Sequence, residues 1–328
     1  MTEPALTAAI LAAVGVLLVL AGLTSPISQR LGVPALVLFL GLGMLAGSEG
    51  VAGIPFEDYD LSFRLGTLAL VLILFDGGLN TSWTVARRAA LPAGLLASVA
   101  VVVTAGIVAA AGYLLGLPIQ LALLAGAVVS STDAAAVFAV LRGSGVRLHE
   151  HTGAVLELES GLNDPMAVFL TLAATEWALG NVHGPAHFAR ELTTQFLVGA
   201  AGGLVIGWLG RALLRNVRLP AIGLYPVLTL AVALLAFGLP TLAGGSGFLS
   251  VYLAGIVLAS GPMPYRAGVR RVHDALAWTA QIVMFVLLGL LVFPSRLEVV
   301  GCTITREVIE KKTPPILAFR GDRRRKEA

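Results

Sequence analysis

Charge, cysteine and phosphate-binding motifs are scarce in this sequence. Only 12% of its 328 residues are charged, whereas 57% are hydrophobic and the mean hydropathy is +0.89. Soluble domains average about 25% charged residues. The lone Cys302 provides no disulfide framework, and no Lys-Ser/Thr pair follows the glycine-rich stretches, which therefore predict helix packing and not a phosphate-binding loop. The composition favours a membrane protein, and we expect neither a cofactor nor a nucleic-acid partner.

Long apolar runs, in contrast, recur along the chain. Ten segments approach the length of about 17 to 25 residues that spans a hydrocarbon core. They cover residues 5–25, 33–48, 63–80, 89–115, 119–141, 152–174, 192–214, 219–238, 241–260 and 275–293. The first has no A-x-A-like cleavage site, so we expect a spanning helix and not a signal peptide. The predicted fold class is an all-α polytopic membrane protein with about ten transmembrane helices.

The placement of arginine predicts the orientation of these helices. Counted together with the ends of the segments that flank them, the loops after the second, fourth, sixth and eighth segments contain only Arg64 and Arg190. The other loops are rich in arginine: Arg30, Arg87, Arg88, Arg142, Arg147, Arg211, Arg215, Arg218, Arg266, Arg270 and Arg271. Short arginine-rich loops remain in the cytoplasm. The N-terminus is therefore predicted to lie outside.

The composition changes abruptly after Arg296. All the lysines, Lys311, Lys312 and Lys326, follow this point, and the tail contains no spanning segment. After ten helices this basic tail would lie outside, against the pattern of the earlier loops. It is either an ordinary solvated tail or a foreign or frame-shifted segment. We favour the second interpretation, with a membrane domain at 1–296 and the tail at 297–328.

Acidic residues interrupt the sixth segment, where each charge costs about 2.5 to 3.5 kcal/mol on insertion scales. The helical period places Glu157, Ser160 and Asp164 on one stripe, and Glu159 and Asn163 on the neighbouring stripe. The small residue at 161 allows a partner helix to approach closely. The proline at 165 frees a backbone carbonyl one turn earlier. These features predict a functional polar face.

A second polar run, Ser130 to Asp133, lies in the middle of the fifth segment. Its side chains can bond their own backbone, so we expect local unwinding there. Unwound carbonyls and a carboxylate form the oxygen-lined ion sites of many secondary transporters. The alternative for both polar runs is a set of hydrogen bonds between packed helices. Asp76, near the end of the third segment, either reaches the membrane interface or supports the site.

Several stretches resemble a known family. They are LGVPALVLFLGLGMLAG, LVLILFDGGLN, SSTDAAAVFAVL, LELESGLNDPMAVFL, SGFLSVYLAGIVLAS and AQIVMFVLLGLLVFPSRL. From Met1 to about Arg296 the chain is similar to bacterial monovalent cation/proton antiporters, and most of all to the NhaP-type potassium/proton antiporters of the CPA1 family. The resemblance implies a homodimer with inverted repeats and about thirteen helices. The chain would then lack the last three.

The resemblance also implies a function and a site. It implies exchange of K⁺, or of Na⁺, for H⁺ across the bacterial inner membrane, in potassium or sodium transport and pH homeostasis. The implied cation ligands are Thr132, Asp133, Ser160 and Asp164, and Asp164 carries the cation and the proton in turn. Asn163 would orient the site.

Three further acids are assigned supporting roles. In the family the acid equivalent to Glu159 is structural and faces an arginine on a later helix. That helix is missing, so we expect Glu159 to be unpaired. Glu157 and Asp76 complete the supporting set. Ala134 stands where many relatives have proline.

We expect a transporter and not an enzyme. Because Asn163 is neutral, one proton should trade for one monovalent cation, and exchange should be electroneutral. A truncated membrane fragment without transport remains an alternative. So does an intramembrane aspartyl protease that uses Asp133 and Asp164 as an acid pair. The Gly-x-Gly-Asp pattern of such proteases is broken by Asn163.

Overall fold

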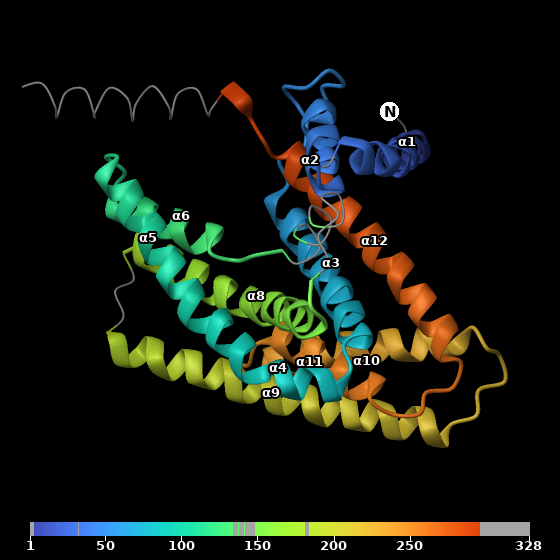
Figure 1. Ribbon diagram of the computed structural model, residues 1–328. Helices are drawn as coiled ribbons and strands as arrows, with labels where there is room; N and C mark the ends of the chain where they lie inside the picture. Colours follow the sequence, from blue (N-terminus) through green and yellow to red (C-terminus); the bar gives the residue numbers. More distant parts are fainter. Residues whose placement is uncertain are drawn as a thin grey trace, which may run out of the picture.

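The computed structural model describes residues 3–31, 33–133, 137, 141, 148–180 and 184–295, and every regular element in these ranges is helical (Figure 1). The elements are α1 (Glu3–Leu31), α2 (Ala35–Ala46), α3 (Tyr59–Asn80), α4 (Trp83–Leu95), the π-helical turn η1 (Leu96–Ala100), α5 (Val101–Leu114), α6 (Ile119–Val129), α8 (Glu150–Ala178), α9 (Pro185–Asn216), α10 (Leu224–Leu242), α11 (Gly247–Ala259) and α12 (Arg266–Leu290). The all-α fold class is confirmed. The tail at 297–328 lies outside the described residues, so its assignment stays a prediction.

Local sequence signals fix several helix boundaries. Pro34 and Pro118 directly precede α2 and α6. At the start of α3 the Asp58 side chain accepts a hydrogen bond from the Leu61 amide, and at the start of α11 the Ser246 side chain accepts one from the Leu249 amide. Each side chain thus satisfies an amide that has no partner within the first helical turn. Other boundaries differ from the prediction, and α10 begins after Gly223 without a side-chain cap. The eighth predicted segment, 219–238, is in fact α10 at Leu224–Leu242.

Five helical runs in the described part of the chain are long and apolar enough to cross a membrane. They are Tyr59–Asn80, Trp83–Leu114, Ala186–Asn216, Leu224–Leu242 and Arg266–Leu290. The second joins α4, η1 and α5 into one run, with Pro92 inside α4 and the π-helical turn following it. The predicted segment at 89–115 therefore starts too late, because Arg87 and Arg88 interrupt the apolar pattern inside the helix.

The main core is built around α11. Most α11 residues are buried, and the helix packs against α3, α9 and α10. Glycines bring these helices to backbone contact. A Cβ added to Gly255 of α11 would lie 2.8 Å from the Phe75 carbonyl oxygen of α3, and one added to Gly78 would lie 2.4 Å from the Tyr252 carbonyl oxygen. We call α3, α9, α10, α11 and α12 the wall.

A second group forms around α8. This helix packs mainly against α4, η1 and α6, and it touches α3 and α11 only along a short stretch. In Figure 1 the helix lies beside α5 and α6, whereas α12 and α2 rise together away from it. The molecule therefore consists of an α8 group and a wall, which meet over a limited contact.

The α2–α12 pair provides a test of close packing. A Cβ on Gly43 of α2 would lie 2.2 Å from the Val286 carbonyl oxygen, whereas Gly41, on the same helix, has nothing within 4 Å. We expect Gly43→Ala to destabilise the protein by about 1 to 3 kcal/mol through overpacking. Thermal unfolding in detergent measures the change. Gly41→Ala is the matched control, and equal melting temperatures for the two variants would contradict this packing.

Candidate functional site

The site begins where α6 ends. The helix stops at Val129, and the Ser130 hydroxyl donates to the Ala127 carbonyl at 2.7 Å, in place of a further helical turn. Residues 131–133 have no regular secondary structure. The predicted unwinding is therefore confirmed, and the fifth segment is not one continuous helix over 119–141. A helix broken inside an apolar protein leaves backbone groups that need new partners.

These partners come from α8. The Ser160 hydroxyl donates to the Thr132 carbonyl at 3.0 Å. Asn163 is fully buried, and its amide nitrogen donates to the Thr132 hydroxyl at 2.7 Å and lies 3.4 Å from the Thr132 carbonyl oxygen. Two α8 side chains, one from each predicted stripe, therefore hold the non-helical segment in place.

Glu159 is part of this network. Its Oε1 accepts a hydrogen bond from the Asn163 amide at 2.9 Å, and both its oxygens lie 3.1 Å from the Thr132 hydroxyl, which donates to them. The side chain is only 9% exposed. The expectation that Glu159 is left without a partner is wrong, because two neutral donors, Thr132 and Asn163, satisfy the carboxylate in place of the arginine that faces this acid in the family. Charge-assisted hydrogen bonds of this kind are the stronger ones.

Asp164 has a different environment. Its Oδ1 accepts a hydrogen bond from the Ser131 hydroxyl at 2.8 Å, and the same hydroxyl lies 3.1 Å from Asn163 Oδ1. The side chain is half-buried and faces a cavity. Sequence reasoning gave Ser131 no individual role. The available signal was its place in the polar run, but contact with Asp164 depends on how α6 and α8 are paired.

A cavity of about 420 Å³ lies between the end of α6, α8 and the wall. Its polar lining residues are Asp76, Ser131, Thr132, Asp133, Glu157, Ser160, Asp164, Tyr252 and Gln281. The stripe predicted for α8 is confirmed, because Glu157, Ser160 and Asp164 all reach the cavity. Asn163 and Glu159 are not among its lining residues. The remaining lining is mostly aliphatic and aromatic. Tyr252 and Gln281 were not predicted.

Asp76 also lines this cavity, and its supporting role stays a prediction. Its Oδ2 accepts a hydrogen bond from the Asn80 amide at 3.1 Å. Among the described residues its Oδ1 is buried without a hydrogen-bond partner. The cavity is therefore lined by residues that carry carboxylate, hydroxyl and amide groups. Oxygen ligands of these kinds suit hard cations, and unwound carbonyls beside a carboxylate suit Na⁺ or H⁺.

Comparison with known proteins gives consistent matches. A family model described as "Sodium/hydrogen exchanger, transmembrane" matches residues 15–318. The K(+)/H(+) antiporter NhaP of Alkalimonas amylolytica is 41% identical over 294 residues, which are 87% of this chain and 50% of the relative. The K(+)/H(+) antiporter NhaP2 of Shewanella sp. (strain MR-4) is 44% identical over 296 residues, which are 89% and 50%. The chain spans about half the length of these curated relatives.

A solved structure supports the fold. The sodium proton antiporter MjNhaP1 from Methanocaldococcus jannaschii at pH 8 superposes with a TM-score of 0.73 at 24% sequence identity. The match covers 92% of this chain and 75% of that protein. At this level of identity the similarity concerns the arrangement of helices.

The buried amide of Asn163 provides the test of the network. Replacing it by alanine removes donors to Thr132 and Glu159 and leaves a buried carboxylate with fewer partners, which costs about 1 to 3 kcal/mol. We expect Asn163→Ala to lower the thermal unfolding temperature in detergent. Asn216→Ala, at an exposed position at the end of α9, should change stability by less than about 0.5 kcal/mol. A wild-type melting temperature for Asn163→Ala would refute the network.

Proposed function

The chain belongs to the sodium/hydrogen exchanger family, and from this premise we propose that it exchanges a monovalent cation for H⁺ across the bacterial inner membrane. The observation that carries the proposal is the position of Asp164, a half-buried carboxylate on a cavity beside a broken helix. K⁺ is the preferred cation because the similar curated proteins are named K(+)/H(+) antiporters. Na⁺ is the alternative cation.

Asp164 is the carboxylate shared by cation and proton. Burial disfavours a bare charged carboxylate, and either a proton or a bound cation removes this cost. The two ligands therefore exclude each other, which couples their movements. The other ligands are Asp133, Ser160 and Thr132. Both oxygens of Thr132 already take part in hydrogen bonds with α8, the hydroxyl with Glu159 and Asn163 and the carbonyl with Ser160.

Exchange is electroneutral in this proposal, with one proton traded for one cation. Asn163, next to Asp164, is neutral. Thr132 and Asn163 both donate hydrogen bonds to the oxygens of Glu159. It is held as a structural acid behind the site. Only Asp164 then changes its proton occupancy in the cycle.

Alternating access requires one part of the protein to move against another. The α8 group carries most of the site, and its contact with the wall is short. We therefore assign the movement to the α8 group and the stationary role to the wall. The N-terminus lies outside, the bilayer surrounds the apolar surface, and the working unit is a homodimer.

The first test removes the charge of Asp164. In proteoliposomes with a pH-sensitive dye, the wild type should show K⁺- or Na⁺-driven proton movement, and Asp164→Asn should reduce it to the level of empty vesicles. Asp60→Asn, at an exposed position in the first turn of α3, is the matched control and should retain exchange.

Both this chain and a chimera should be measured, because the chain spans about half the length of the relatives. The chimera joins residues 1–295 to the remaining part of the Shewanella antiporter. Exchange by Asp164→Asn in either form refutes the assignment. A silent chain with an active chimera supports a fragment that does not transport alone.

The second test concerns stoichiometry. One-for-one exchange moves no net charge, so its rate should not depend on membrane potential. We expect cation-driven proton movement to change by less than about twofold when a thiocyanate gradient imposes about 100 mV, a potential worth about 2.3 kcal/mol per charge moved. A rate that follows the sign of the potential would show that net charge moves in each cycle and would refute one-for-one exchange.

A further inference from the structure

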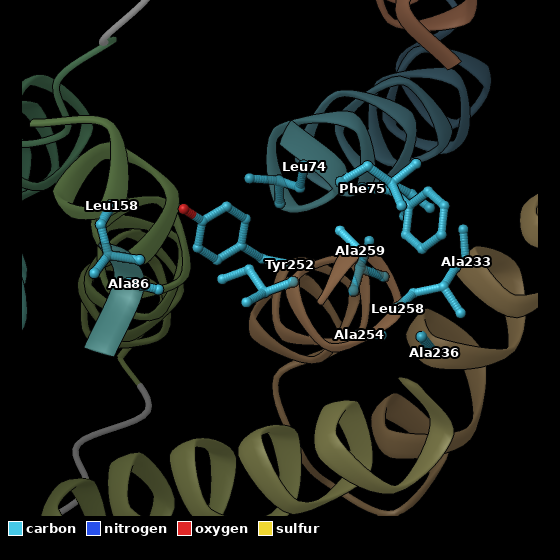
Figure 2. Close-up of a cluster of buried hydrophobic side chains, with 14 of the residues drawn as sticks. Leu74, Phe75, Ala86, Leu158, Ala233, Ala236, Tyr252, Ala254, Leu258 and Ala259 are labelled. Carbon is cyan, nitrogen blue, oxygen red and sulfur yellow. The ribbon is translucent and has the colours of Figure 1, made fainter. Parts of the chain in front are cut away.

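One aromatic ring lies where the α8 group meets the wall. Tyr252 of α11 is 2% exposed, and its ring lies between glycines of two other helices. A Cβ on Gly161 of α8 would lie 2.6 Å from Tyr252 Cζ, and one on Gly77 of α3 would lie 3.7 Å from Cε2. Figure 2 shows the ring between Leu158 and the α3 side chains Leu74 and Phe75.

The hydrogen bond of this ring is made to the wall. The Thr81 hydroxyl donates its proton to the Gly77 carbonyl at 2.8 Å. In the 3.5 Å contact between Tyr252 Oη and Thr81 Oγ1, the tyrosine must therefore be the donor. Tyr252 belongs to α11 of the wall, and Thr81 directly follows α3 at the start of the connection to α4. The atoms nearest Gly161 are ring carbons, so α8 meets this side chain by van der Waals contact.

Contacts inside the wall have a different character. A Cβ on Gly203 of α9 would lie 2.5 Å from the Ser250 carbonyl oxygen, and the Gly78–Gly255 contact between α3 and α11 is also made by backbone atoms. Interlocked backbones resist sliding, because each displacement drives Cα atoms against carbonyl oxygens. A flat ring that faces a glycine has no protruding backbone atoms that would block sliding.

We propose that Tyr252 is a positioning residue for exchange, and that its ring is the surface over which Gly161 carries the α8 site past the wall. The proposal rests on the proposed function. It explains why the ring is bonded to the wall and borders the cavity. It also explains why the ring faces Gly161, where a Cβ has no room, and not Gly153 of the same helix, where a Cβ would meet nothing.

The primary experiment compares two glycines on the same helix. Gly161→Ala places a methyl group against the ring, whereas Gly153 has nothing within 4 Å. In proteoliposomes of the active form, we expect Gly161→Ala to lower the maximal exchange rate at least about tenfold, which corresponds to about 1.4 kcal/mol on the barrier. The cation KM should stay within about threefold of wild type. Gly153→Ala should match wild type in both quantities.

Second-site variants test the ring itself. Tyr252→Val removes the carbons that meet position 161, so Gly161→Ala with Tyr252→Val should recover at least half of the lost rate. Tyr252→Phe keeps Cζ and both Cε atoms, so Gly161→Ala with Tyr252→Phe should remain slow. Thermal unfolding in detergent confirms that each variant is folded.

Three results would overturn the proposal while leaving cation/proton exchange intact. The first is a Gly161→Ala rate equal to that of Gly153→Ala. The second is a KM that rises in proportion to the loss of rate, since the ring would then belong to the binding site. The third is equal rescue by Phe and Val. Wild type and Asp164→Asn are measured in the same vesicles. A wild type that is silent both as this chain and as the chimera overturns the proposed function and this inference with it.

Discussion

The site depends on one buried amide, the side chain of Asn163. Its nitrogen donates to the Thr132 hydroxyl and to Glu159, and its oxygen lies within hydrogen-bonding distance of the Ser131 hydroxyl. It therefore joins α8 to the segment where α6 is no longer helical. A broken helix in an apolar protein is tolerated only where its freed polar groups find partners. An amide suits this position because it donates and accepts without adding a charge.

The two neighbouring stripes of α8 give their acids different environments. Glu159 is nearly inaccessible, and neutral donors contact both of its oxygens. Asp164 lies five residues further along α8, has one oxygen bonded to Ser131 and faces the cavity. An acid whose oxygens are bonded to neighbouring donors is held in place, whereas an acid at a cavity remains accessible to a ligand. The difference arises from the helical period, because a rotation of one position carries a side chain from the network to the cavity.

Much of this arrangement is local, and the local part could be predicted. Hydropathy located each helical run, the spacing of polar residues separated the α8 stripes, and the Ser130 to Asp133 run indicated the break in α6. What could not be predicted depends on which helices are neighbours. The contact of Ser131 with Asp164, the cavity position of Asp76 and the ring over Gly161 all join segments far apart in the chain. No periodicity within one segment contains that information. The partners of Glu159 could not be predicted in full for the same reason, since one of its two donors, Thr132, lies on another segment of the chain.

Glycine has two opposite uses in these contacts, although its cost inside a helix, about 0.5 to 1 kcal/mol relative to alanine, is the same for both. In the wall, Gly78 and Gly255 bring α3 and α11 into contact through backbone atoms, and the many atoms that then touch hold the helices in one register. At Gly161 the neighbour is instead a ring, and the absent Cβ removes a ridge without creating an interlock. The helix that carries the acids, α8, therefore contacts the wall through a flat ring and not through interlocked backbone atoms. A rigid wall and a smooth contact beside the cavity are both required if the site is to move while its own hydrogen bonds stay intact.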